Sequence, residues 1–220
     1  MKKRNFITSL HQSTKRNYIE RMIDDKVFAM KVAKKYGRDY WDGSRKFGYG
    51  GFKYLPGRLT PLAKKIIKIY GLNNKSKILD VGCGKGYLLY EIKKILPLIN
   101  VVGFDISSYA IKNSKNEIKQ YLFKYDANKK FKFKKKSFDL VLSFGTLHNL
   151  KLEKLFSCVK EIERVGKKKF IMVESYRNNQ ELFNLQCWAL TCETFLSEDQ
   201  WIWLYKLSGY TGDYEFIYFK

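Results

Sequence analysis

Strand-like and helix-like segments alternate along the chain from residue 77 onward. Short apolar runs of the kind that form buried strands are KILDV, NVVGFD, YLFKYD, FDLVLSF, KKFIMVES and YEFIYF. The segments between them with helical spacing of apolar residues are GYLLYEIKKIL, SYAIKNSKNEIKQ and LEKLFSCVKEIERV. Strands that alternate with helices form a parallel sheet covered on both faces, so the pattern predicts an α/β fold.

The residues before this region have a different pattern. Apolar positions at helical spacing predict one helix over 14–36, and Gly37 is a typical residue at a helix end. Residues 37–58 are rich in glycine and aromatic residues and have no periodicity, which predicts a loop. We therefore divide the chain into an N-terminal helix with an aromatic lid loop, 1–58, and a main domain, 59–220.

Two further helices are predicted from their first residues. Thr60 as the cap and Pro61 at the first helical position predict a helix over roughly 60–71. Ser197 followed three residues later by Gln200 is a capping-box pattern, which predicts a helix at 198–208.

Composition narrows the class of protein. With 220 residues, 45% of them hydrophobic, the chain is long enough for one α/β domain with a sizeable core. No apolar run reaches the roughly 18–20 residues that a membrane span needs, and the basic N-terminus lacks the apolar core of a signal peptide. The four cysteines form no C-x-x-C pair, which favours reduced thiols in the cytoplasm. With only His11 and His148, a His-rich metal site is excluded, and no metal site is predicted.

The net charge of +22 favours two interpretations. A strongly basic chain is typical of nucleic-acid binding, and a lysine cluster within residues 124–136 favours RNA as a binding partner. The excess is mostly lysine, however, and arginine is the better reader of phosphates and bases. An A/T-biased coding sequence explains the same excess. The cluster comprises Lys124, Lys129, Lys130, Lys132, Lys134, Lys135 and Lys136.

The stretch ILDVGCGKGY places a glycine loop directly after the first predicted strand of the alternating region. Ligands of parallel sheets bind at the carboxyl ends of strands, so this loop is a candidate ligand site. A dinucleotide-binding loop has the spacing G-x-G-x-x-G, but here Gly82, Gly84 and Gly86 follow one another at every second residue. Asp80 would repel a pyrophosphate, whereas its carboxylate suits the ammonium group of S-adenosylmethionine.

Two more acids end the next two predicted strands. Asp105 follows Gly82 by 23 positions, the length of one helix and one strand, and is placed to accept hydrogen bonds from both ribose hydroxyls. Asp126 ends the third strand, where it can receive the amino group of adenine. Three acids at three consecutive strand ends form a stronger signal than the glycines alone.

With these motifs the chain resembles the class I S-adenosylmethionine-dependent methyltransferases over roughly 75–180, through ILDVGCGKG, VVGFDIS, KYDAN and FDLVLSFGTLHNL. The resemblance implies their Rossmann-like fold and S-adenosylmethionine as cofactor. One departure is the C-terminus, where the family often has two strands in a hairpin and this chain has one clear strand. The cofactor contacts assigned on this basis are Asp80, Gly82, Cys83, Gly84, Asp105, Ile106, Asp126, Ala127 and Phe144.

The flanking segments DYWDGSRKFGYGGFKY, VESYR and GYTGDYEFIYF are similar to methyltransferases of bacterial surface-polysaccharide gene clusters. Aromatic residues of the lid loop are candidates for cation–π contacts with the sulfonium, or for packing of the N-terminal helix onto the sheet. Tyr54 is counted with the cofactor-binding residues, and Arg58 is expected to meet the methionine carboxylate of the cofactor. The aromatic set is Tyr40, Trp41, Phe47, Tyr49, Phe52 and Tyr54.

A hydroxyl acceptor needs a general base, because a neutral hydroxyl is a poor nucleophile. His148, after the fourth strand of the region, is one candidate, and a structural histidine is the competing interpretation. Glu174 and Tyr176 at the end of the fifth strand also point to the site, and Glu174 is the other candidate base.

The acceptor is less defined by the sequence. The N-x-P-P-[YF] motif of amide- and adenine-directed methyltransferases is absent, since SFGT follows the fourth strand. We therefore expect a small-molecule or sugar-linked acceptor, such as a nucleotide sugar or polysaccharide precursor, covered by the lid loop and residues 180–196. An RNA methyltransferase and a non-catalytic partner subunit are the competing hypotheses.

Overall fold

The computed structural model describes residues 1–49 and 52–220 of the chain. Gly50 and Gly51, which belong to the predicted lid loop 37–58, lie outside the described residues. No helix in the described ranges is long and apolar enough to cross a membrane.

Six parallel strands form one sheet in the order β3-β2-β1-β4-β5-β6. This confirms the parallel sheet predicted from the alternating pattern, and all six predicted strands are present with somewhat different bounds. Because β1 lies at the centre and the order changes direction there, the ends of β1 and β4 form the crevice where such sheets bind ligands. The strands are β1 Lys77–Val81, β2 Asn100–Asp105, β3 Leu122–Lys124, β4 Phe138–Phe144, β5 Gly166–Glu174 and β6 Asp213–Ile217.

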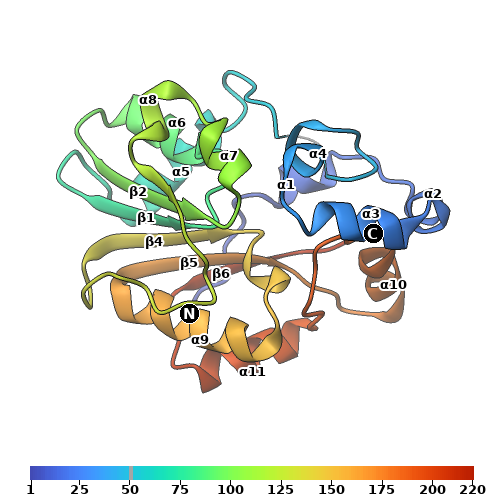
Figure 1. The fold of residues 1–220 in the computed structure, drawn as a ribbon. Coiled ribbons are helices and arrows are strands. Elements are labelled where there is room, and N and C mark those ends of the chain that lie inside the picture. The colour runs from blue at the N-terminus through green and yellow to red at the C-terminus, as the bar shows by residue number, and fades with distance from the viewer. Residues whose placement is uncertain (50–51) are drawn as a thin grey trace.

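Helices cover both faces of the sheet (Figure 1). One hydrophobic core joins the sheet to α5, α6 and α8, and a second core joins the opposite face to α9 and α11. The helices of these layers are α5 Thr60–Tyr70, α6 Tyr87–Ile95, α7 Ser108–Lys112, α8 Asn116–Lys119, α9 Leu152–Val165 and α11 Glu198–Leu207, with the short 3₁₀ helix η1 Leu147–Asn149 before α9.

The N-terminal helices lie beyond the carboxyl ends of the strands, next to α10 (Figure 1). Two small aromatic cores hold this layer together, one around Trp188 and Phe219 and one around Tyr40 and Leu190. Residues from the two ends of the chain therefore form one cover over the ligand-binding edge of the sheet. These helices are α1 Thr8–Gln12, α2 Tyr18–Ile23, α3 Lys26–Ala33, α4 Arg38–Asp42 and α10 Asn179–Trp188.

The single helix predicted over 14–36 is wrong, because the chain turns between α2 and α3. Asp25 adopts a left-handed conformation with φ of 42°, which ends regular α-helix. Its side chain accepts a hydrogen bond from the Phe28 amide and so caps the second helix. The helical spacing of apolar residues continues in the sequence across Asp24 and Asp25, so the spacing alone did not reveal that a new helix begins there.

Two other boundaries also differ from the predictions. The segment 37–58 is not loop throughout, because α4 lies within it. The helix predicted over 108–120 is divided into α7 and α8. Ser107 caps α7 by accepting a hydrogen bond from the Ala110 amide at 3.0 Å, and Ser197 and Gln200 form the predicted capping box of α11.

The sheet ends at β6 with a single strand, as the sequence predicted, and the N-terminus covers its outer edge. The Arg4 amide donates to the Tyr214 carbonyl at 2.8 Å, and the Tyr214 amide donates to the Lys2 carbonyl at 3.1 Å. Buried Glu215 accepts hydrogen bonds from the backbone amides of Phe6 and Thr8. These contacts satisfy an otherwise exposed strand edge and fix where the N-terminal layer begins.

Candidate active site

The glycine loop after β1 forms the floor of the site. Gly82 and Gly84 both have positive φ, 76° and 55°, which glycine adopts without steric cost. A Cβ atom at Gly82 would lie 2.1 Å from the Thr146 hydroxyl, and one at Gly84 would lie 2.9 Å from the Trp41 ring. The loop is thus shaped so that its backbone faces a ligand at close range, with Thr146 and Trp41 packed against it.

Asp105 at the end of β2 shapes this loop. Its carboxylate accepts hydrogen bonds from the Gly84 amide at 2.9 Å and the Ser107 amide at 2.8 Å. Burial raises the pKa of Asp105, and these two hydrogen bonds oppose the rise by stabilising the ionised form. The carboxylate is therefore held in place at the edge of the cavity, as recognition of two ribose hydroxyls requires.

Asp80 at the end of β1 is buried next to Asp105, and none of the described side chains forms an ion pair with it. Burial, and then repulsion by Asp105, raise the pKa of Asp80 to about 7. A buried carboxylate without a cation is costly, so the site favours a ligand that brings its own positive charge. An ammonium group, such as that of S-adenosylmethionine, would meet this requirement.

A cavity of about 390 Å³ lies over the glycine loop, and we call it the donor cavity. Its size is in the range of cavities that bind cofactors and other small ligands. The strand ends converge on it because all strands run the same way, so their carboxyl ends share one edge. The lining includes all nine of the cofactor-binding residues assigned from the family motifs: Asp80, Gly82, Cys83, Gly84, Asp105, Ile106, Asp126, Ala127 and Phe144.

The N-terminal layer is fastened to the donor cavity by α4. The Trp41 indole donates to the Ser107 hydroxyl at 2.8 Å, and the same hydroxyl donates to the Tyr36 carbonyl at 2.6 Å. Asp42 accepts hydrogen bonds from buried Lys85 at 2.6 Å and from Tyr109. The α4 helix is thereby tied to the glycine loop and to α7, the two elements that flank the cofactor position.

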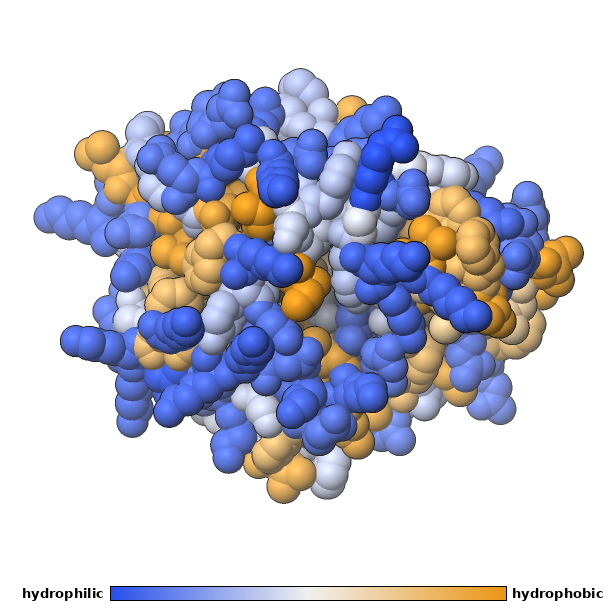
Figure 2. Space-filling view, viewed as in Figure 1, coloured by the Kyte–Doolittle hydropathy of each residue, from blue (hydrophilic) through white to orange (hydrophobic). Residues whose placement is uncertain are grey.

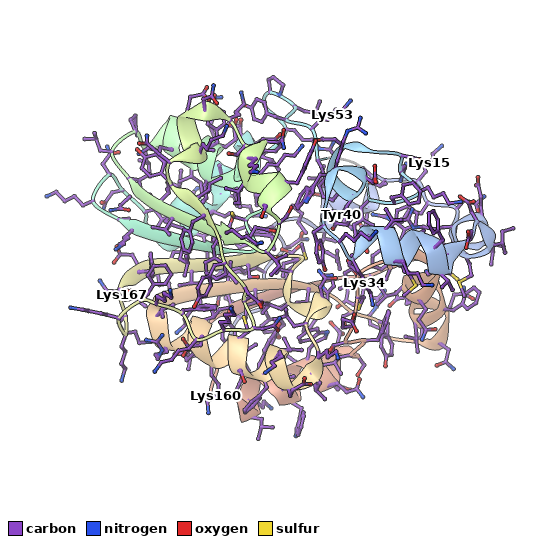
Figure 3. The ribbon with its side chains drawn as sticks, in the orientation of Figure 1. Lys15, Lys34, Tyr40, Lys53, Lys160 and Lys167 are labelled. Atoms are coloured by element: carbon purple, nitrogen blue, oxygen red, sulfur yellow. The ribbon has the colours of Figure 1, made fainter. Side chains whose placement is uncertain are left out.

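A second cavity of about 400 Å³ adjoins the donor cavity, and we call it the acceptor cavity. Tyr40, Phe52, Phe144 and Gly145 line both, so the two cavities meet at a junction walled by aromatic rings. In Figure 3, Tyr40 lies between the N-terminal helices and the strand ends. Aromatic faces at this junction suit a sulfonium cation.

His148 and Glu174 meet in the acceptor cavity. The Glu174 amide donates to His148 Nδ1 at 3.3 Å, and His148 Nε2 lies 3.4 Å from Glu174 Oε2. Burial lowers the pKa of His148 to about 3, so the ring is neutral and, with Nδ1 accepting, carries its proton on Nε2. Burial raises the pKa of Glu174 to about 7, although Arg16 lowers it in part. Within the described chain, Glu174 Oε2 is buried and accepts no hydrogen bond.

Three of the residues predicted from the sequence lie elsewhere. Tyr54 is not among the residues that line either cavity, because its hydroxyl donates to Glu91 and its ring packs on α6. Arg58 lines the acceptor cavity and not the donor cavity. Tyr176 is held by a bridge to Ser197 and packs in the core around Trp188, outside the described lining of both cavities.

The structure also adds residues that sequence reasoning missed. Arg16 and Arg45 line the acceptor cavity together with Trp188, and Thr146 packs on the glycine loop. Neither arginine belongs to a recognisable motif, and each is far in sequence from the strand ends. The residue type could have indicated them, because arginine is scarce in this lysine-rich chain and most of its arginines lie within residues 1–58.

Comparison with known proteins agrees with this geometry. A family model described as a methyltransferase domain matches residues 72–209. Among solved structures, a putative methyltransferase from Bacillus halodurans has a TM-score of 0.55 at 21% identity, covering 67% of this chain and 68% of that one. A SAM-dependent methyltransferase from Archaeoglobus fulgidus has a TM-score of 0.55 at 19% identity, covering 78% and 72%. These two likenesses show the fold.

Among curated proteins, an uncharacterised MG259 homologue from Mycoplasma pneumoniae is 35% identical over 74 residues. The match spans 33% of this chain and only 16% of that protein.

The parallel sheet, the glycine loop and the acids at its strand ends define a class I S-adenosylmethionine-dependent methyltransferase. The chain belongs to the methyltransferase-domain family, whose model matches more than half of it. Residues 72–209 therefore form a methyltransferase domain, whose methyl donor is S-adenosylmethionine.

Proposed function

We propose that the enzyme transfers the methyl group to a hydroxyl oxygen of a small or sugar-linked acceptor, such as a nucleotide sugar or polysaccharide precursor. The observation that carries the proposal is the acceptor cavity, which adjoins the donor cavity and contains Glu174 Oε2, a carboxylate oxygen with no hydrogen-bond partner among the described residues. A cavity of this kind suits a small ligand with one reacting group.

Glu174 is the general base in this proposal, and His148 positions it. His148 is poorly suited to take a proton, because Nδ1 already accepts the Glu174 amide hydrogen and burial keeps the ring neutral. Glu174 has a buried oxygen that accepts no hydrogen bond from the described residues, and its pKa of about 7 is in the range in which a base serves well near neutral pH. Its carboxylate would accept the hydroxyl proton as the oxygen attacks.

The cofactor residues have separate duties in the donor cavity. Asp80 pairs with the ammonium group, Asp105 accepts the ribose hydroxyls, and Asp126 with Ala127 faces the adenine. Bound S-adenosylmethionine supplies a sulfonium-activated methyl group. The aromatic segment that contains α4 acts as the lid, since Trp41 and Asp42 of α4 are tied to the elements around the cofactor. The lid excludes water and aligns the acceptor, and alignment alone contributes up to roughly 7–11 kcal/mol in favourable cases.

The test compares Glu174→Gln with wild type in conversion of S-adenosylmethionine to S-adenosylhomocysteine, over a panel of nucleotide sugars and a mixed RNA. We expect kcat to fall by roughly 10²–10⁴ in the variant, with the affinity for S-adenosylmethionine unchanged. Glu193→Gln is the matched control, because this carboxylate pairs with Lys34 and lines neither cavity. Near-normal turnover of Glu174→Gln would show that Glu174 is not the base.

RNA methylation is the alternative outcome of the same panel. The lysine cluster at 124–136 does not favour it, because no lysine of that cluster is among the described residues that line the donor or acceptor cavity. Lysine side chains such as Lys160 and Lys167 point outward in Figure 3, and hydrophilic residues cover most of the face seen in Figure 2. A charge spread in this way is typical of a solvated surface.

A further inference from the structure

The acceptor cavity continues into a third cavity of about 610 Å³, which we call the outer cavity. Arg16, Arg45 and Trp188 line both, so the two spaces form one path that leads away from Glu174. Lys15, labelled in Figure 3 on the N-terminal layer, and Lys46 line the outer cavity as well. The path therefore begins at the proposed base and becomes increasingly basic.

Three guanidinium groups gather over one indole ring in this path. The guanidinium carbons of Arg16, Arg21 and Arg45 lie 5.5, 4.3 and 5.3 Å from the centre of the Trp188 ring. Each stacking contact is favourable, but like charges at such short range repel one another. Burial lowers the pKa of both Arg16 and Arg21, and repulsion by Arg45 lowers it further. Glu174 opposes this shift at Arg16, and Asp24 opposes it at Arg21.

Among the described residues, no carboxylate forms an ion pair with any of these three arginines. In the described chain, the arginine ion pairs are those of Arg4, Arg164 and Arg177. Arg16 binds two backbone carbonyls and His11, and its Nε is buried with no hydrogen-bond partner in the described chain. The outer cavity contains two acids, Glu20 and Asp24, and Asp24 forms an ion pair with Lys46.

The arginines that line the acceptor and outer cavities differ in how many of their N–H groups already donate hydrogen bonds. Arg21 donates to the carbonyls of Trp188, Arg45 and Gly48, so it fixes the shape of the wall. Arg45 and Arg58 are exposed, line the acceptor cavity and make no side-chain hydrogen bond with the described residues. Arg45 and Arg58 are thus the arginines whose donors are all available to a ligand, and Arg16 adds its positive charge beside them in the lining of the acceptor cavity.

We propose that Arg16, Arg45 and Arg58 form an anion subsite for a diphosphate group carried by the methyl acceptor. Guanidinium forks match phosphate oxygens, and several uncompensated charges match a diphosphate better than a single carboxylate. The acceptor is then an alcohol or sugar esterified to a diphosphate, with its hydroxyl at Glu174 and its diphosphate toward Trp188. This rests on the proposed function, because it places the subsite relative to the methyl-transfer centre.

The test is calorimetric titration of inorganic pyrophosphate into the protein loaded with S-adenosylmethionine. We expect binding that weakens with added salt, and a Kd raised about tenfold, or about 1.4 kcal/mol, in Arg45→Gln and in Arg58→Gln. Arg38→Gln is the matched control, since Arg38 is an exposed arginine of the same layer that lines none of the three cavities. It is expected to bind pyrophosphate like wild type.

Different failures are distinguishable in this design, because S-adenosylmethionine binding is measured first in the same samples. If the cofactor binds and pyrophosphate does not, the subsite is refuted and the proposed function stands. An equal loss in Arg38→Gln and Arg45→Gln would mean attraction by net charge alone, which also refutes the subsite. Malonate binding as tightly as pyrophosphate would overturn the assignment to a diphosphate. If the cofactor itself does not bind, the proposed function and the subsite both fall.

Discussion

Asp80 links the stability of the enzyme to its cofactor affinity, and Asp80→Asn tests that link. The side chain is buried beside Asp105 without a cation, and its pKa is raised from 3.8 to about 7. Three pKa units correspond to about 4 kcal/mol of preference for the neutral form. Ionised Asp80 therefore destabilises the folded enzyme in the absence of ligand, and a bound ammonium group relieves this destabilisation.

The direction of the pH effect follows from the raised pKa. The folded-state pKa exceeds the unfolded value, so the stability contribution of protonated Asp80 is fully present below pH 3.8 and is lost as the pH rises through about 7. Asparagine keeps the neutral state at every pH. We expect Asp80→Asn to unfold at a higher temperature than wild type at about pH 8, by at most the equivalent of about 4 kcal/mol, with the difference disappearing near pH 4.

Cofactor binding changes in the opposite direction. Wild-type Kd for S-adenosylmethionine should rise about tenfold for each pH unit below about 7, because binding requires ionised Asp80. In Asp80→Asn, the Kd should be higher and nearly independent of pH in this range. Thermal unfolding and calorimetry between about pH 5 and 8 measure both effects.

Asp126→Asn is the control, because Asp126 lines the same cavity but is not buried. In this variant the Kd for S-adenosylmethionine should still depend on pH as in wild type. A wild-type Kd that is constant from about pH 5 to 8 would refute the reasoning, as would an Asp80→Asn variant that is less stable at about pH 8.

Three further variants test the glycine loop, the lid and the N-terminal anchor. Gly84→Ala forces a Cβ into a left-handed position against Trp41, and calorimetry with thermal unfolding should show a loss of about 1–3 kcal/mol in stability together with weaker cofactor binding. Asp42→Asn removes the ionised acceptor of Lys85, so the affinity for S-adenosylmethionine should fall several-fold, whereas exposed Asp39→Asn should leave it unchanged. Glu215→Gln weakens charge-assisted hydrogen bonds to the N-terminal backbone, and limited proteolysis should then cut before α1 more quickly, with about 1.5–3 kcal/mol of stability lost. Unchanged proteolysis of that variant would mean that the N-terminus is held by other contacts.

The donor cavity was predictable because its determinants are local. Each candidate acid lies close to the carboxyl end of a strand: Asp80 is the last residue but one of β1, Asp105 ends β2, and Asp126 comes two residues after β3. Parallel strands bring these ends to one edge whatever the lengths of the connections. Asp80, Asp105 and Asp126 could therefore be placed from strand periodicity alone. The glycine spacing added the shape of the loop, and the structure places all three acids in the lining of the donor cavity.

The acceptor cavity was not predictable in the same way, because it is assembled from distant segments. Arg16, Arg45, Glu174 and Trp188 come from four parts of the chain that periodicity does not relate. The broken helix at Asp25 illustrates the difficulty, since one local cap redirects the chain and decides which side chains face the cavity. Arg58, the last residue of the predicted loop, was expected to meet the methionine carboxylate, and only the tertiary fold shows it in the lining of the acceptor cavity.

The N-terminal layer contributes to both cavities, and this has a consequence for how they work together. Tyr40 and Phe52 line the donor and acceptor cavities at once, and Trp41 packs on the glycine loop. A ligand that orders this layer over the donor cavity also positions the walls of the acceptor cavity. The second ligand then binds with a smaller loss of conformational entropy, because the layer is already ordered, and this is the condition for positive coupling between two sites. In the proposed function, cofactor binding thus prepares the acceptor cavity, and the lid does more than exclude water.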